Sequence, residues 1–445
     1  MSHPTPQLID TLISARWIIP IRPAKTVLEN HSIAIDGGNI IAILPTDQAM
    51  AQFDAKHGID LPTHTLTPGL INAHGHAAMS LFRGMADDQP LQSWLEQFIW
   101  PAEQQWVDEE FVRDGTQLAI AEMLRSGTTT FSDMYFFPNV VAKAASDAGI
   151  RAQITFPVFN FPTIWGQNPD DYIRKGLAVR DDFKHSELVD VVFGPHASYT
   201  VSDEGLQKVA MLAAELDISI HIHVHETQQE VDNELKLHGQ RPLARLHHLG
   251  LLGPKTQLVH MTTLSDEDIA MVKASGASVI HCPQSNLKLA SGFCPVQVLM
   301  DQGITIALGT DGAASNNSLD MFTEMRTAAL LAKAVADDAA ALNDWQALEA
   351  ATLGGAKALS IDSKLGSLEV GKQADIIAID FSAIELQPVY APVSQLVYTA
   401  CGHHVSHSWV HGRQILADRQ PVNLDLAEIA AKAQSWRDKM INTQH

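Results

Sequence analysis

Apolar strands alternate with helical stretches through the middle of this 445-residue chain, and this alternation constrains its fold more than any other feature. Stretches such as 109–125, 204–216 and 266–273 have the composition of helices. The strands predicted between residues 66 and 312 are 69–73, 128–134, 151–158, 189–195, 218–224, 257–260, 277–282 and 304–310. Because parallel strands need long crossover connections, eight such units predict an α/β fold, a (β/α)8 TIM-like barrel.

Both ends of the chain are rich in predicted strands instead. Residues 32–43 alternate, turn at an Asp-Gly-Gly and alternate again, which is the pattern of a β-hairpin. Residues 371–380 and 405–416 add short apolar strands next to glycine turns. We therefore predict two domains, a composite β-sandwich from residues 1–66 plus 368–445 and a barrel over residues 67–367.

Composition excludes some classes of partner. The 30 Lys and Arg against 51 Asp and Glu give a net charge of −21, which argues against nucleic acid or an anionic membrane as partner. No apolar run approaches the roughly 20 residues of a membrane helix, and the N-terminus lacks a signal-peptide pattern. The three cysteines show no CxxC spacing, as expected in a reducing compartment. We predict a cytoplasmic protein with a small-molecule substrate.

Histidines and acidic residues stand at the ends of four predicted barrel strands. The first strand ends in His74-Gly75-His76, the sixth in His260, and the eighth in Thr310 and Asp311. The fifth ends in the His-Ile-His-Val-His-Glu run of residues 221–226, whose three imidazoles share one face of a strand. His221 is expected to lie deeper and to be packed. Active sites of such barrels lie at the carboxyl ends of the strands, so these groups are predicted to converge.

Each of these signals has a simpler explanation when taken alone. A His-x-His pair is often structural, and an Asp after a strand is often a turn residue or a helix N-cap. Their coincidence at four strand ends favours a metal site. Three imidazoles and one carboxylate suit one divalent metal, Zn²⁺ first and Fe²⁺ second, which would acidify a water. Glu226, just beyond the strand, is placed to act as a proton donor.

These motifs resemble the amidohydrolase superfamily, and the resemblance spans nearly the whole chain. The segments that carry it are 68–76, 223–226, 260 and 309–312. Within the superfamily the chain is most similar to methylthioadenosine/S-adenosylhomocysteine deaminases. That similarity is carried by residues 94, 101–103, 193–196, 285–289, 292, 295–296 and 310–319. It implies hydrolysis of an adenine nucleoside, foremost 5′-methylthioadenosine to 5′-methylthioinosine and ammonia.

The resemblance also implies roles for the residues of the reaction centre. Asp311 is the base that takes a proton from the attacking water, Glu226 is the acid toward the purine ring nitrogen, and His260 steadies the attacking oxygen. The implied metal ligands are His74, His76, His223 and Asp311.

The implied substrate contacts have alternatives. Glu103 would accept ribose hydroxyls, Trp94 would form a wall of the purine pocket, and His196 would be a polar contact. Trp94 shares a helical spacing with its apolar neighbours, so it could belong to the core. Glu103 follows Pro101 and could be only a first-turn helix carboxylate.

Two departures from relatives refine the prediction. Two-metal members of the superfamily carry a bridging lysine after the fourth strand, whereas residues 193–196 hold none, so a single metal is expected. Relatives that use S-adenosylhomocysteine can place arginines after the third strand. Here residues 155–162 are apolar, which favours a methylthio group and leaves adenosine and S-adenosylhomocysteine as secondary substrates. Arg174 remains a candidate contact for the carboxylate of S-adenosylhomocysteine.

Two alternatives remain at this stage. The first keeps the fold and the metal but changes the substrate, as in a guanine or pterin deaminase or a triazine hydrolase. The second is a non-catalytic metal-binding protein, which the presence of Glu226, His260 and Asp311 disfavours. A homodimer is expected from the base rate for such enzymes.

Overall fold

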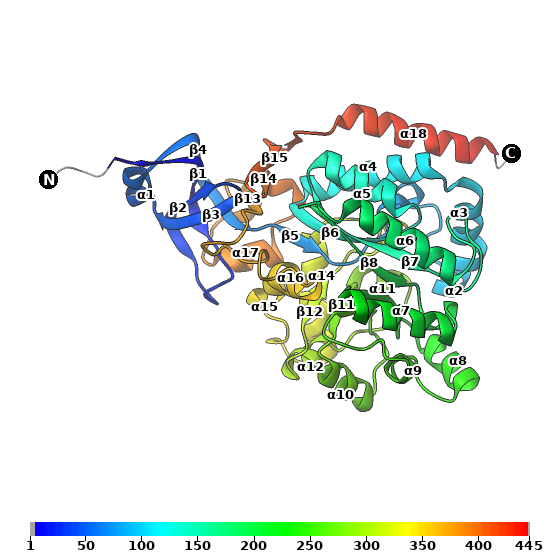
Figure 1. Cartoon of the computed structure of the whole chain (residues 1–445). Coiled ribbons are helices and arrows are strands. Elements are labelled where there is room, and N and C mark those ends of the chain that lie inside the picture. The colour runs from blue at the N-terminus through cyan, green and yellow to red at the C-terminus, as the bar shows by residue number, and fades with distance from the viewer. Residues whose placement is uncertain (1–4, 444–445) are drawn as a thin grey trace.

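The computed structural model describes residues 5–443, which form two eight-stranded sheets. Figure 1 shows the sheet built from the chain ends on the left and the helix-covered barrel on the right. No helix among these residues is long and apolar enough to cross a membrane.

The barrel consists of parallel strands in sequential order, as predicted. Its strands are β5 (Leu70–Asn72), β6 (Thr128–Met134), β7 (Arg151–Val158), β8 (Val189–Pro195), β9 (Ile220–Val224), β10 (Thr256–His260), β11 (Ser278–His281) and β12 (Ile306–Leu308). Ala73 N donates to Leu308 O at 2.9 Å and Asp311 N to His74 O at 3.0 Å, so the first and last strands meet. The predicted barrel is thereby confirmed.

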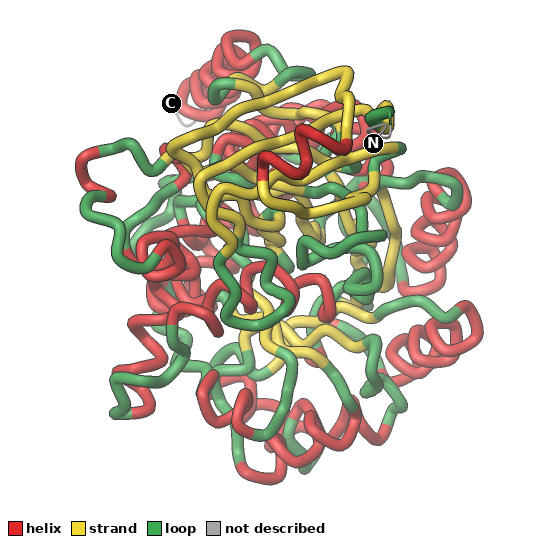
Figure 2. Tube along the Cα trace, turned by 90° about the vertical axis from the view of Figure 1, so that its left-hand side faces the viewer, coloured by secondary structure: helices red, strands yellow, loops and turns green. Residues whose placement is uncertain are grey.

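Helices surround the barrel strands (Figure 2). The helices between strands are α4 (Glu109–Arg125), α5 (Pro138–Ala148), α6 (Pro169–Phe183), α7 (Asp203–Leu216), α8 (Gln228–His238), α9 (Pro242–His248), α10 (Asp266–Ser275), α11 (Pro283–Lys288) and α12 (Val296–Asp301). Several begin where a polar side chain accepts a hydrogen bond from a backbone N–H of the first turn, which satisfies an otherwise unpaired donor. These caps are Asp108, Asn168, Ser202, Thr227 and Ser265.

The long connection after β5 forms one side of the site. It contains η1 (Ala77–Phe82), α2 (Leu91–Ser93), the π-helical turn η2 (Trp94–Ile99) and α3 (Trp100–Trp106). After β12 follow α13 (Ala313–Asn316), α14 (Met321–Ala336), α15 (Asp344–Glu349), η4 (Ala350–Gly354), α16 (Gly355–Ala358), α17 (Pro392–Tyr398) and α18 (Leu426–Thr443). Helix α18 lies along α4 at the top of Figure 1, and Trp436 donates to Asp114 at 3.1 Å.

The terminal strands make one mixed sheet in the order β16-β15-β14-β13-β4-β1-β2-β3. Their bounds are β1 (Gln7–Ile18), β2 (Leu28–Asp36), β3 (Asn39–Pro45), β4 (Phe53–Pro68), β13 (Ile376–Asp380), β14 (Val405–Val410), β15 (Arg413–Ala417) and β16 (Gln420–Pro421). Ile33, Ile376 and Trp409 share one buried core, so the two ends of the chain contribute to one sheet and one core. The division at residues 66 and 367 stays a prediction.

A buried ion pair joins the two sheets. Arg151, on β7, donates to Asp375 through Nε at 2.6 Å and through a second nitrogen at 3.2 Å. Both side chains are less than a tenth exposed. The pair lies at the amino end of β7, away from the strand ends that carry the histidines.

Candidate active site

The carboxyl ends of the barrel strands open into a cavity of about 720 Å³. His76, His223, His260, Asp311 and Glu226 line its floor. The predicted groups from four different strands are therefore brought together at one end of the barrel.

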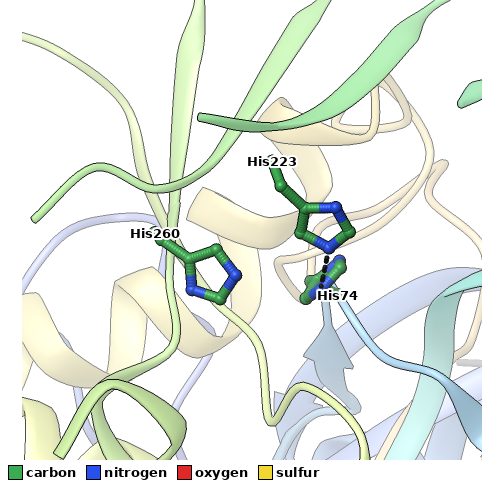
Figure 3. A group of neighbouring side chains, drawn as sticks. All are labelled: His74, His223 and His260. Atoms are coloured by element: carbon green, nitrogen blue, oxygen red, sulfur yellow. Dashed lines mark hydrogen bonds between the residues drawn. The ribbon is translucent and has the colours of Figure 1, made fainter. Parts of the chain in front are cut away.

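His74 lies against these floor residues and is itself completely buried. Its Nε2 lies 3.2 Å from Nε2 of His223 and 3.4 Å from Oδ1 of Asp311. Nε2 of His76 lies 3.2 Å from the same Asp311 oxygen. Figure 3 shows the rings of His223 and His260 turned toward His74. Gly309 lets its own backbone pass close to His74, because a Cβ at residue 309 would lie 2.8 Å from Cβ of His74.

The Nδ1 atoms of these rings point away from the cluster. Nδ1 of His76 lies 2.6 Å from Met134 O, and Nδ1 of His223 lies 2.8 Å from His196 O. Carbonyls only accept, so each Nδ1 carries a proton. Burial lowers the pKa of His74 and His223 well below the usual value, so both rings are neutral and Nε2 of His223 is unprotonated.

This arrangement tests whether the residues fit a metal ion. The contact between the two Nε2 atoms, dashed in Figure 3, is a hydrogen bond only if one nitrogen carries a proton. Nδ1 of His74 lies 2.8 Å from His221, which leaves its Nε2 bare when Nδ1 is the donor. Two ligands about 2.1 Å from one tetrahedral ion lie about 3.4 Å apart, close to the separations at this floor. The donor set therefore fits a divalent cation.

Asp311 is held by hydrogen bonds on both carboxylate oxygens. Oδ2 accepts from Ser285 at 2.6 Å, and Oδ1 accepts from the Gly312 N–H at 2.8 Å. Burial alone would raise its pKa, but His74 and His76 outweigh burial and hold the pKa well below its usual value. Burial likewise opposes ionisation of His76, but Asp311 raises the His76 pKa to about 9. Asp311 is thus an ionised carboxylate that can bind a metal and accept a proton.

Glu226 faces the same floor as an acid. Burial, with the charges of Asp311 and Glu230, raises the pKa of Glu226 well above its usual value. Glu230 fixes the backbone by accepting from the N–H of Glu226 at 2.7 Å, and Thr262 donates to its carbonyl at 2.8 Å. A carboxyl group whose pKa is raised in this way holds its proton more tightly and can give it to a substrate.

His260 differs from the other three histidines in its Nδ1 partner. That partner is the side-chain amide nitrogen of Asn286, 3.0 Å away. A donor at this position leaves Nδ1 as the acceptor, so Nε2 carries the proton. Nε2 lies 3.7 Å from Glu226. His260 and Asp311 both adopt left-handed backbone, with φ of 76° and 60°, strain that is common at functional sites.

The predicted substrate residues also line the cavity. Trp94 is buried, and its indole N–H has no hydrogen-bond partner among the described residues, so it belongs to both core and cavity. Glu103 accepts from the Tyr135 hydroxyl at 2.7 Å, and burial raises the Glu103 pKa to about 7. His196 stacks on Phe159 with ring centroids 4.9 Å apart, and burial lowers its pKa to about 3.

The remaining walls are mostly apolar and aromatic. They include Phe136, Phe159, Phe161 and Ile164. None of the described residues that line the cavity is a lysine or an arginine. Arg174, left open as a contact for a substrate carboxylate, is exposed on α6 and pairs with Asp171 at 2.6 Å. The structure therefore does not bring it to the cavity.

Sequence reasoning missed several contributors and misplaced one. Ser285 and Asn286 lay within a recognised motif to which no role was given. Tyr135 follows β6 directly, so the strand-end rule could have found it. His225 does not share the face of His223, because β9 ends at Val224 and His225 has a φ of 54°.

Comparison with known proteins identifies the family. The model of the amidohydrolase family matches residues 65–415. The chain belongs to the amidohydrolase family. It is 55% identical over 440 residues to a 5-methylthioadenosine/S-adenosylhomocysteine deaminase from Saccharophagus degradans, covering 99% of this chain and 98% of that protein. These findings confirm the resemblance and the predicted hydrolytic deaminase.

Solved structures agree with the architecture. An adenosine deaminase from Xanthomonas campestris with bound zinc has a TM-score of 0.97 and 47% identity, covering 98% of this chain and all of that one. A triazine hydrolase variant has a TM-score of 0.89 and 26% identity, covering 96% and 99% of the two chains. Together with the cluster at the floor of the cavity, the zinc-bound adenosine deaminase supports a site for a divalent metal.

Proposed function

We propose that this chain hydrolytically deaminates an adenine nucleoside, with 5′-methylthioadenosine as the preferred substrate. The observation that carries the proposal is a buried carboxylic acid, Glu226, beside an imidazole–carboxylate cluster at the floor of an aromatic cavity. Relatives named as deaminases of methylthioadenosine and S-adenosylhomocysteine support the substrate class.

We assign His74, His76, His223 and Asp311 as ligands of a single Zn²⁺, since the segment after β8 offers no lysine to bridge a second ion. Fe²⁺ is the alternative ion. When bound, the ion would lower the pKa of the attacking water from 15.7 toward about 7. Zinc in the similar adenosine deaminase supports this choice.

The acid and base residues then divide the proton transfers. Asp311 accepts one proton of the attacking water, whose oxygen bonds to C6 of the purine. Glu226 donates its proton to the ring nitrogen N1, and His260 Nε2–H donates a hydrogen bond to the attacking oxygen. The C6–N6 bond breaks, and the amino group leaves as ammonia with the proton from Asp311. The proton left on the new oxygen returns to Glu226, so one water is consumed per ammonia released.

The walls position the nucleoside. We assign Glu103 to the ribose hydroxyls, Trp94 to one purine face and His196 to a polar contact. A cavity without lysine or arginine offers no cationic partner to the carboxylate of S-adenosylhomocysteine, whereas a methylthio group gains from burial against phenylalanines. We therefore rank methylthioadenosine above adenosine and S-adenosylhomocysteine.

A spectrophotometric deamination assay on zinc-loaded protein tests the proposal. Methylthioadenosine, adenosine, S-adenosylhomocysteine, guanine, a pterin and a triazine are compared, with Glu226→Gln as the control. Turnover of methylthioadenosine that the control loses would support it. Turnover of a triazine, a pterin or guanine alone would replace it with the alternative substrate class.

The expected homodimer, cytoplasmic location and lack of nucleic-acid binding stay predictions. Sedimentation of the purified chain tests the first of them. The expected result is a species of twice the 48.5 kDa chain mass.

A further inference from the structure

A row of buried, hydrogen-bonded polar side chains leads from the floor of the site into the interior of the barrel. Nδ1 of His74 lies 2.8 Å from Nε2 of His221, and Nδ1 of His221 lies 2.6 Å from Oε1 of Gln257. Nε2 of Gln257 donates to Oε1 of Gln153 at 2.9 Å, and Nε2 of Gln153 donates to Leu359 O at 3.2 Å. All four side chains are at most 4% exposed.

The direction of every hydrogen bond in this row follows from its last member. A carbonyl can only accept, so Gln153 must present its amide N–H to Leu359 and its oxygen to Gln257. Gln257 then presents its oxygen to His221, which must donate from Nδ1. An imidazole whose one proton lies on Nδ1 has an accepting Nε2, so Nδ1 of His74 is the donor in this arrangement. Nε2 of His74 is consequently unprotonated.

We propose that His221, Gln257 and Gln153 are a positioning relay that presents the bare Nε2 of His74 to the divalent metal ion. The inference rests on the metal site of the proposed function. It goes beyond that function because none of the three residues touches the cavity. Through successive hydrogen bonds, the relay connects Gln153, inside the barrel, to a metal ligand at the carboxyl end of the barrel.

His74 needs such a relay more than the other imidazole ligands do. His76 and His223 donate to backbone carbonyls, and because a carbonyl oxygen only accepts, the direction of these two hydrogen bonds is fixed. The partner of His74 is another imidazole, which can exchange its two tautomers. Without Gln257, His221 could carry its proton on Nε2, and His74 would then accept at Nδ1 and hold its own proton on Nε2. A protonated Nε2 cannot bind a metal ion.

The ring geometry supports an in-plane bond between the two imidazoles. Their centroids are 5.0 Å apart and their planes are inclined by 20°. Two nearly coplanar rings joined through N–H···N at 2.8 Å are expected at this separation. His221 is therefore more than the packed residue that its sequence position suggested.

Zinc affinity of Gln257→Met tests the relay, because methionine keeps the volume and removes both hydrogen bonds. Competition with a chromophoric chelator is expected to show a loss of about 10- to 100-fold, the range for partners that orient metal ligands. Gln257→Glu is expected to bind zinc with an affinity within about threefold of that of the parent protein. A buried carboxyl stays protonated, so its C=O accepts from His221 and its O–H donates to Gln153.

A matched control separates orientation from stability. Arg151→Met breaks the buried pair between the barrel and the terminal sheet and is expected to lower the melting temperature while zinc affinity stays unchanged. Parent-like zinc affinity in Gln257→Met, or an equal loss in Arg151→Met, would overturn the proposal. Should Gln257→Met fail to fold, Gln153→Met decides, with an expected loss of about 3- to 10-fold and an unchanged affinity as the contrary result. Zinc binding is read without substrate, so a wrong substrate assignment would not affect this test.

Discussion

The floor and the walls of the cavity differ in how their side chains are held. At the floor, Nδ1 of all four histidines and both oxygens of Asp311 have a defined hydrogen-bond partner. The walls consist mostly of aromatic and aliphatic surfaces, and Glu103 with Tyr135 is a polar pair among them. We infer that hydrogen bonding fixes the chemistry, whereas shape and the absence of cations select the substrate.

The largest expected effect comes from the acid of the floor. Glu226→Gln keeps the shape and removes the transferable proton, so kcat should fall by about 10³- to 10⁴-fold, while KM changes only a few-fold. Steady-state kinetics on protein of equal zinc content measures this. A kcat within tenfold of the parent value would show that the proton comes from elsewhere.

Loss of the hydrogen bond from Asn286 to Nδ1 of His260 should lower kcat by a smaller factor. Asn286→Asp replaces the donor with an acceptor, so His260 would carry its proton on Nδ1 and lose the Nε2–H that faces the substrate. We expect kcat to fall by about 10- to 100-fold with zinc retained. In a His260→Ala background the same change should cost nothing further, since Asn286 acts through His260. An equal loss in both backgrounds would contradict this role.

The polar pair of the wall predicts a pH dependence. Glu103 accepts hydrogen bonds from ribose hydroxyls more strongly when it is ionised, and its pKa is raised to about 7. The carboxylate population of the free enzyme, and with it kcat/KM, should rise about tenfold from pH 6 to pH 8. The same raised pKa means that ionisation of Glu103 destabilises the fold as pH rises from 4.5 through about 7. A pH profile unchanged in Glu103→Gln would remove this residue from nucleoside binding.

The smallest expected effect tests the walls. Ile164 lines the cavity and is 53% exposed, so a long side chain can be accommodated there. Ile164→Arg should raise kcat/KM for S-adenosylhomocysteine relative to methylthioadenosine by about three- to fivefold, the scale of a partly exposed ion pair. Ile164→Gln is the neutral control. A ratio that moves equally in both variants would mean that charge is not what excludes the larger substrate.

Most of the barrel could be predicted from the sequence because strand-like segments alternate with helical ones along the chain. β6, β7, β8 and α4 have the predicted bounds. β5 and β12 are shorter than predicted, and beyond the end of β12 the Thr310 N–H donates to the Asn72 side chain at 2.9 Å. Strand alternation also fails at His225, whose left-handed backbone ends the period of two.

The residues of the site also divide into those that the sequence predicted and those that it did not. The position of the histidines, Glu226 and Asp311 at strand ends predicted that they lie together, because the carboxyl ends of parallel barrel strands open at the same end of the barrel. The partners that orient them lie on other strands, such as Gln257 on β10 and Gln153 on β7. Their pairing depends on barrel register, which no local pattern encodes. That is why His221 was expected to be only a packing residue.

The most direct test of the account is turnover of methylthioadenosine by the zinc-loaded chain in H₂¹⁸O, followed by mass spectrometry and ammonia determination. Hydrolytic attack at C6 predicts one ¹⁸O in each methylthioinosine formed and one ammonia per product. Absence of turnover, or a product that lacks ¹⁸O at C6, would contradict the assignment of this site as an adenine nucleoside deaminase.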